Sequence, residues 1–480
     1  MPEPTARQAA MLHGPIAKTI LALAGPTVAV LVIQTAVGVA ETFYVGFLGT
    51  DALAGVAVVF PVLMLMTMAS NGGIGGGVAS AVARALGAGR RADADALATH
   101  AIAIALLFGA LFTALALGCG PAIYGALGAH GPALHAALTY STFVFIGAIA
   151  NWTVNLASSA LRGAGNVRVP ATVNLVAACV LIPLSPAFIF GIGPVPRLGI
   201  AGAGIAVTLY YLAAALWLLR YLAGGRGGVT LRLVPLRGRP FWDILRVGLP
   251  SALGSVQTNL TVALVTGAVG LFGTDALAGY GMASRLDYVL IPLLFGLGTA
   301  VVTMVGTNVG AHQHARARRI AWTGALIGAL GTEAIGLAAA LAPWAWLELF
   351  SRDPRVVALG TLYLRTVGPV YGATGFGLLL YFAGQGAGRV VWLVLAGTAR
   401  LLIAAGLGWY AVGALHAGLG TLFAIVGLAS VTYATVSAIV MLRMPWGAPE
   451  SVANLPPWPA TVTASSTSSP SAPSKATLSP

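Results

Sequence analysis

Long stretches without a charged residue constrain this chain more than any other feature. Each is long enough for one membrane-spanning helix of about 20 residues, and the longer ones can hold two. The stretches are continuously apolar, whereas the strands of membrane barrels are short and alternate. The sequence therefore predicts transmembrane helices. The windows that lack Asp, Glu, Lys and Arg are 19–40, 52–83, 96–161, 169–196, 247–274, 366–388 and 401–442.

The composition excludes several classes of protein. Hydrophobic residues make up 58% of the chain and charged residues 8%, against about 25% charged in a soluble domain. The net charge is +13, but the basic residues stand at the ends of the apolar stretches, which indicates membrane topology and not nucleic-acid binding. Cys119 and Cys179 lie in apolar segments without metal-ligand spacing, and we expect them to be packing residues. We expect no metal and no cofactor.

One long unit, nearly half of the chain, occurs twice in the sequence. VGFLGTDALAGV at 45–56 and VGLFGTDALAGY at 269–280 are identical at nine of twelve positions, at an offset of 224. The unit is far longer than the roughly 20–50 residues of a solenoid repeat, so it indicates a duplicated domain. Further pairs at nearly the same offset are Pro26 with Pro250, Gly87 with Gly310, and Gly163 with Gly384.

The predicted fold is an all-α membrane protein with twelve transmembrane helices. Six spans return the chain to its starting side, so the two repeats share one orientation and a pseudo-twofold axis runs along the membrane normal. In transporters of this kind the binding site lies between the halves. The predicted spans are 16–44, 53–83, 95–117, 134–157, 169–190, 200–221, 242–267, 277–307, 315–341, 356–381, 390–411 and 418–442.

Charge placement predicts topology and domain boundaries. All but six of the 25 Lys and Arg residues fall on one side of this layout, counting the tail, so the positive-inside rule places both termini in the cytoplasm. We expect a multi-pass, monomeric protein of the inner (plasma) membrane whose first span is retained as a signal anchor. The predicted domains are a bundle over 1–222, a basic cytoplasmic linker over 223–241, a bundle over 242–444 and a disordered tail over 445–480.

Glu41 is the clearest candidate for function, because an ionisable group inside a bilayer is costly. Gln34 and Gly38 stand seven and three residues earlier, on the same helical face. Burial disfavours a charged carboxylate, so a proton could be taken up or released near neutral pH. The alternative is a glutamate at the outer interface, solvated or paired with an arginine.

Other polar residues within apolar spans are candidates for the substrate cavity, with hydrogen bonding between helices as the alternative. Arg285 and Asp287 are two residues apart and do not share a helix face. Pro26 is a candidate hinge, since proline removes a backbone hydrogen bond; a fixed kink is the alternative. Glu333, Arg365 and Arg400 are weaker candidates. The cavity candidates are Gln34, Asn71, Asn151, Asn155, Asn174, Gln257, Asn259, Arg285 and Asp287.

Glycines at 71–77, NGGIGGG, contain a superficial phosphate-loop pattern. No Lys-Ser/Thr follows it, and Gly72 with Gly76 has the spacing of close helix packing. We therefore expect this segment to be a helix-packing motif and not a nucleotide site.

Motifs in both halves resemble the MATE (multidrug and toxic compound extrusion) family, and most closely its DinF-type branch. The resemblance covers about residues 14–442. It rests on AETFYVGFLGTDALAG at 40–55, ALGAG at 85–89, LRGAGN at 161–166, PAFIFGIGPVPRLGIAGAGIA at 186–206, GTDALAGYGMASRLDYVLIPLLFGLGTAVVTMVGTNVGA at 273–311 and AGQGAG at 383–388.

The resemblance implies a secondary active antiporter that exports amphipathic or cationic compounds by alternating access, in exchange for protons. Glu41 occupies the position of the family's span-1 aspartate, which takes up a proton while span 1 bends. Ser185 stands where the family often has a second acid. Sodium coupling, and export or flipping of a lipid-linked or endogenous metabolite, remain alternatives. A membrane enzyme would need clustered catalytic or metal-binding residues at a membrane face, and the sequence shows none. A purely structural membrane protein would not explain Glu41 or the duplicated six-span unit.

Overall fold

The computed structural model describes residues 6–192, 196–232 and 234–447, and in these ranges every regular element is helical. Within these ranges, eleven helices are long and apolar enough to cross a membrane, and a bent pair, Gly131–Ile146 with Ala148–Gly163, supplies a twelfth crossing. The predicted all-α fold of twelve spans in two repeats is confirmed. Residues 448–480, most of the predicted disordered tail, lie outside the described residues.

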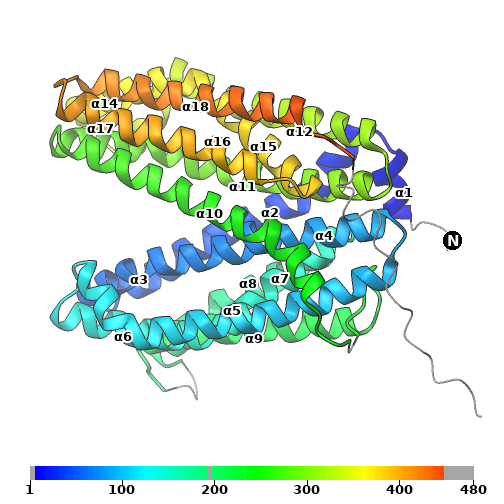
Figure 1. Cartoon of the computed structure of the whole chain (residues 1–480). Helices are drawn as coiled ribbons and strands as arrows, with labels where there is room; N and C mark the ends of the chain where they lie inside the picture. Colours follow the sequence, from blue (N-terminus) through cyan, green and yellow to red (C-terminus); the bar gives the residue numbers. More distant parts are fainter. Residues whose placement is uncertain (1–5, 193–195, 233, 448–480) are drawn as a thin grey trace, which may run out of the picture. The chain divides into compact units, whose positions relative to one another are not determined.

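The described part of the first repeat runs from α1 to α9 (Figure 1). A short helix precedes the first span, and a π-helical segment, η1, interrupts the second span. The elements are α1 (Ala6–His13), α2 (Ile16–Gly46), α3 (Thr50–Met68), η1 (Ala69–Ile74), α4 (Gly75–Gly87), α5 (Arg91–Ala126), α6 (Gly131–Ile146), α7 (Ala148–Gly163), α8 (Arg168–Phe190) and α9 (Ile200–Ala223).

The second repeat begins with α10 at Gly238, a little before the predicted start of the span. Its second span is one unbroken helix, α11. The elements are α10 (Gly238–Gly270), α11 (Thr274–Gly310), α12 (His314–Leu341), α13 (Pro343–Leu347), α14 (Pro354–Val367), η2 (Gly368–Val370), α15 (Tyr371–Ala387), α16 (Val391–Leu401), η3 (Leu402–Leu407), α17 (Gly408–Gly413) and α18 (Leu419–Arg443).

The repeated GTDALAG motif forms the same turn in both halves. Gly49 and Gly273 precede α3 and α11 with φ values of 106° and 97°, a region that side chains with a Cβ rarely adopt. Asp51 and Asp275 follow in the first turn of each helix, where the helix dipole favours a negative charge. The motif therefore fixes the connection between the first two spans of each repeat.

The fourth span of the first repeat bends by 47° at Gly147. Two threonines from neighbouring helices donate to backbone carbonyl groups beside the bend. Thr208 donates to the carbonyl of Phe143 at 2.7 Å, and Thr113 to that of Phe145 at 2.5 Å. A Cβ at Gly147 would lie 2.6 Å from the Thr208 hydroxyl, so glycine allows α9 to approach here.

The first helix of each repeat inserts its beginning into the core of the other repeat. Ile20 of α2 is buried among residues of α11 and α12, whereas Ile244 of α10 is buried among first-repeat residues. Ile20 and Ile244 are related by the same offset as the two GTDALAG motifs, so they occupy the same position in the repeat. This reciprocal exchange ties the two repeats together at one end of the bundle.

That end also gathers most of the arginines and is called the arginine-rich end below. It holds the connections at 88–90, 164–167, 224–232 and 311–313. The expectation that Cys119 and Cys179 are packing residues is wrong, because both are exposed on the surface of the helices.

Candidate functional site

Glu41 lies near the end of α2 and contacts α8. Its Oε2 accepts a hydrogen bond from Ser185 at 2.9 Å, and Ser185 is fully buried. The other carboxylate oxygen is buried without a hydrogen-bond partner. The ion pairs found in the described part of the chain involve Asp93, Asp95 and Asp243, so no arginine neutralises Glu41 there. The result is a single acid held by one hydroxyl within a membrane helix.

Gln34 belongs to a second polar group on the same three helices. Its Nε2 donates to Oδ1 of Asn174 at 3.2 Å, and the Tyr210 hydroxyl donates to the same oxygen at 3.3 Å. Val37 and Leu181 are buried in the small apolar cluster of α2, α8 and α9. Glu41 is two helical turns from Gln34, about 10 Å along the helix. The Glu41–Ser185 pair and the group of Gln34, Asn174 and Tyr210 therefore lie on either side of an apolar contact between α2 and other helices of the first repeat.

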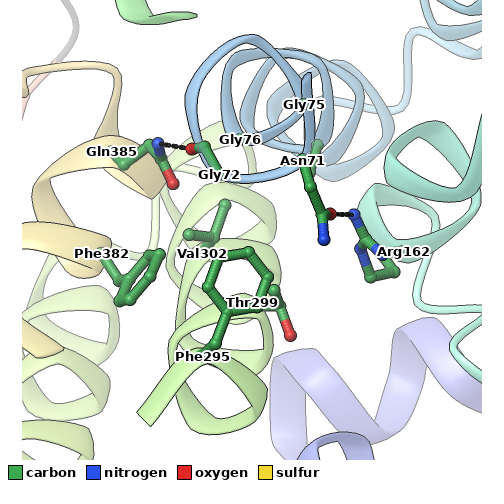
Figure 2. Close-up of a pocket in the computed structure, with 11 residues that line it drawn as sticks. Asn71, Gly72, Gly75, Gly76, Arg162, Phe295, Thr299, Val302, Phe382 and Gln385 are labelled. Atoms are coloured by element: carbon green, nitrogen blue, oxygen red, sulfur yellow. Dashed lines mark hydrogen bonds between the residues drawn. The ribbon is translucent and has the colours of Figure 1, made fainter. Parts of the chain in front are cut away.

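A narrow pocket lies where the two repeats meet (Figure 2). Nη2 of Arg162 donates to Oδ1 of Asn71 at 2.7 Å on one side, and on the other Nε2 of Gln385 donates to the carbonyl of Gly72 at 3.0 Å. Its volume is about 10 Å³, enough for about one water molecule. Its other lining residues are Gly75, Gly76, Ala79, Phe295, Thr299, Val302 and Phe382.

The repeats are joined by matching hydrogen bonds near the arginine-rich end. Ser80 on α4 donates to the carbonyl of Gly386 at 3.0 Å, and Thr303 on α11 donates to the carbonyl of Arg162 at 3.0 Å. Ser80 and Thr303 share the register of Gly87 and Gly310, so they occupy equivalent positions in the repeat. The hydroxyl of one repeat therefore binds the end of the fourth span of the other, in both directions.

Backbone contact between α4 and α11 follows the same symmetry. A Cβ added at Gly87 would collide with the carbonyl oxygen of Thr307, and one at Gly310 with that of Arg84. Gly87 corresponds to Gly310 and Arg84 to Thr307 in the repeat. We call this crossing, with the Ser80 and Thr303 hydrogen bonds, the repeat junction.

The remaining first-repeat candidates bind one another. Nδ2 of Asn155 donates to Oδ1 of Asn151 at 2.9 Å and to the Ser70 hydroxyl at 2.8 Å.

Pro26 lies inside α2. The NGGIGGG segment packs closely as expected: a Cβ at Gly73 would lie 2.8 Å from the Cα of Ala252, and one at Gly77 would lie 2.5 Å from the Ile244 carbonyl.

The second-repeat candidates are distributed over several helices. The Tyr363 hydroxyl lies 3.4 Å from Oδ2 of Asp287, and Arg285 lies over the Phe350 ring at 5.2 Å. These two neighbours thus have different partners, as their spacing predicts. Nε2 of Gln257 donates to Thr398 at 2.7 Å, whereas Asn259 contacts the sulfur of Met68 at 2.9 Å.

The weaker candidates have local environments. Oε2 of Glu333 accepts from the backbone N–H of Gly372 at 2.6 Å. Arg400 lies over the Tyr433 ring at 5.7 Å, and Arg365 is exposed. No group of three His, Cys, Asp or Glu residues that could hold a metal occurs within the described ranges.

Sequence reasoning missed Arg84, Arg162 and Gln385. The sequence places both arginines at the ends of apolar stretches, where they indicate topology. In the structure Arg162 is only 9% exposed where the two repeats meet, and Arg84 donates to Ser80 and to the carbonyl of Gly386. Gln385 also donates to the Ser251 hydroxyl at 2.9 Å. One signal was available: Gln385 interrupts AGQGAG where the first repeat has Ala164.

The duplicated six-span unit, with its polar groups facing other helices, defines a polytopic membrane transporter. The family model described as MatE matches residues 26–187 and 250–410, which is both repeats. The chain belongs to the MATE family.

Several named relatives cover most of this chain. A FAD transporter of Shewanella oneidensis is 28% identical over 78% of this chain and 82% of its own length. A probable multidrug resistance protein NorM of Thermotoga maritima is 27% identical over 74% of this chain and 76% of its own. The multidrug export protein MepA of Staphylococcus haemolyticus is 23% identical over 75% and 80%.

Solved structures show the same fold. A MOP superfamily transporter from Pyrococcus furiosus matches with a TM-score of 0.83 at 25% identity, over 92% of this chain and 98% of that one. A crystal structure of MATE in the bent conformation matches with a TM-score of 0.84 at 24% identity, over 92% and 97%.

Proposed function

We propose that this protein is a secondary antiporter that exports amphipathic, cationic organic compounds in exchange for protons. The observation that carries the proposal is the isolated Glu41–Ser185 contact, a carboxylate in a membrane helix with one hydroxyl donor and one unpartnered oxygen. Such a group can bind a proton or attract a cation. A sodium site needs several oxygen ligands. Ser185 supplies one hydroxyl at a position where a second carboxylate would bind sodium better. Protons are therefore the preferred coupling ion in this proposal.

The arginine-rich end faces the cytoplasm in this proposal, because basic connections are retained on that side. The repeat junction then acts as the cytoplasmic gate, and its direct backbone contacts and hydrogen bonds support this role. A ligand shifts a conformational equilibrium only by its different affinity for the two states. Protonated Glu41 and bound substrate must therefore favour different arrangements of the repeats.

The test is efflux of a fluorescent cationic dye from proteoliposomes under an imposed pH gradient. Glu41→Gln keeps a similar shape but cannot exchange a proton, so we expect dye binding to persist and proton-driven efflux to fall to background. Glu333→Gln is the matched control, since the N–H of Gly372 can still donate to the amide oxygen, and efflux should stay near wild type. Efflux by Glu41→Gln equal to wild type would overturn the role of Glu41.

A second candidate function is export of an anionic endogenous metabolite such as a flavin nucleotide. Two observations favour it: the similarity to the FAD transporter of Shewanella oneidensis, and the buried Arg162 at the pocket between the repeats. The same proteoliposomes loaded with FAD distinguish the two. FAD efflux without dye efflux, lost in Arg162→Gln, would replace the drug-export proposal.

A further inference from the structure

The surfaces at the starts of α5 and α12 occupy equivalent positions in the two repeats but have different surroundings. The helices begin at Arg91 and His314, which share the register of Gly87 and Gly310 in the repeat. On α5 the linker between the repeats covers this surface. The backbone N–H of Thr230 donates to Asp95 at 2.7 Å, and Nε of Arg232 lies 3.3 Å from the same carboxylate.

On α12 the charge at this position is reversed. Arg318 stands where α5 has Asp95, and Trp322 where α5 has Thr99. A groove of about 490 Å³ opens here between α2, α12 and α18. It is lined by Ile16, Arg318, Arg319, Trp322, Thr323, Leu326 and Leu442.

The two arginines of the groove are exposed. The ion pairs recorded for the described ranges use Arg90, Arg232 and Arg246, so no carboxylate there neutralises Arg318 or Arg319. Arg318 and Arg319 also have no hydrogen bond among those recorded for these ranges, whereas the neighbouring Arg316 donates to the carbonyl of Gly14. The groove thus presents two adjacent, exposed cations that no carboxylate of the described ranges neutralises.

The apolar side of the groove continues into a surface suited to an acyl chain. Leu326, Leu330 and Leu442 are 55%, 71% and 66% exposed on helices long and apolar enough to span a membrane. Trp322 stands one turn from Arg318 on α12, and tryptophan is enriched at membrane–water interfaces. Cations at the rim, an interfacial tryptophan and leucines below them match the order of a phospholipid from headgroup to tail.

We propose that this groove binds one anionic phospholipid, with its phosphate between Arg318 and Arg319 and an acyl chain along Leu326 and Leu442. Basic pockets between helices on the cytoplasmic side are suited to such headgroups. The lipid would cover the start of α12 as the linker covers the start of α5. The inference rests on the proposed cytoplasmic placement of the arginine-rich end, but not on the substrate or the coupling ion.

The test measures lipid binding without transport. The full-length protein is placed in phosphatidylcholine nanodiscs with increasing amounts of brominated phosphatidylglycerol, and quenching of Trp322 is taken as the difference between wild type and Trp322→Phe. We expect saturation at a low mole fraction of the anionic lipid. The double variant Arg318→Gln/Arg319→Gln should bind about twenty-five-fold more weakly, since each arginine near the surface contributes roughly fivefold.

Matched variants keep the test specific. Arg318→Lys/Arg319→Lys retains the charge and should retain most of the quenching. Arg220→Gln/Arg226→Gln removes two other exposed arginines of the same end and should bind like wild type. Equal quenching by brominated phosphatidylcholine, or unchanged binding in the glutamine variant, would overturn the proposal.

Two results separate the alternatives. Relief of quenching by millimolar inorganic phosphate would assign the groove to a soluble anion and overturn the lipid proposal. Because the readout needs no turnover, lipid binding with normal affinity in Glu41→Gln shows that the groove is independent of transport. A failed dye-efflux experiment would therefore leave the lipid result intact.

Discussion

At the residue scale, Asn174 holds three membrane helices together through one side chain. Its Oδ1 accepts from Gln34 on α2 and Tyr210 on α9, and its Nδ2 donates to the carbonyl of Pro170 at 2.8 Å. Asn174→Ala would leave two donors without their acceptor, at a cost of about 1–3 kcal/mol for a buried group left unpaired. We expect a lower midpoint of thermal unfolding for the purified variant.

The control for Asn174 is Thr35→Val. Thr35 is exposed on α2 and its hydroxyl donates only to the carbonyl of Leu31 in its own helix, so its loss should leave the midpoint almost unchanged. A midpoint for Asn174→Ala that matches this control would contradict the linking role of Asn174.

The difference between Glu41 and Arg162 shows what sequence could reveal about single residues. Glu41 and Gln34 lie within the predicted first span, 16–44, so their placement inside a membrane helix was predictable. Arg162 lies beyond the end of the predicted fourth span, 134–157, where basic residues usually mark a loop. Its burial depends on Asn71 and Ser159, both of which accept from it at 2.7 Å. Hydropathy carries no information on such partners.

At the element scale, the second span differs between the repeats. The first repeat has α3, η1 and α4 where the second has the continuous α11. The N–H of Gly75 binds the carbonyl of Ser70 across the wider π turn, and the carbonyl of Gly72 accepts from Gln385 of the other repeat. The repeat in the sequence predicts equal helices, so this interruption could not be inferred from it.

The crossing of α4 and α11 gives a prediction for two glycines. Valine at Gly87 or at Gly310 would collide with the backbone of the opposite helix, so the repeat junction could not close. We expect each variant to lose transport, because the proposed alternating access needs the closed junction, while the protein still reaches the membrane. Dye efflux from proteoliposomes measures the effect.

Gly118→Val is the matched control for these variants. Gly118 lies within α5, and a Cβ there meets nothing within 4 Å. Its efflux should remain near wild type apart from the small cost of a β-branched residue in a helix. Wild-type efflux by both Gly87→Val and Gly310→Val would show that the crossing does not act as a gate.

At the scale of the whole molecule, the duplication makes the contact between the repeats reciprocal. Ile20 and Ile244 are each buried in the core of the other repeat, and Gly87 and Gly310 each lie against the backbone of the opposite helix. The uncharged windows and the repeated motifs made the twelve spans and the common orientation predictable. The close approach of the two repeats was not predictable from the sequence. It depends on which small residues of one repeat contact which residues of the other, and the sequence does not specify these pairs.

Ala83 and Gly306 lie at the centre of this contact and provide the last test. They occupy equivalent positions in the repeat, and a Cβ at Gly306 would lie 2.9 Å from that of Ala83. Cysteines at both positions, in a Cys119→Ser/Cys179→Ser background, should form a disulfide after a small adjustment, since the usual Cβ separation is about 3.8 Å. We expect oxidation to stop efflux and reduction to restore it.

The single variants Ala83→Cys and Gly306→Cys separate the cross-link from the substitutions, because oxidation should not affect either one. If the cross-linked protein transports dye at the rate of the reduced protein, the junction does not open during the cycle. Inhibition that is reversed by reductant would instead mean that the two repeats separate at Ala83 and Gly306 in every cycle.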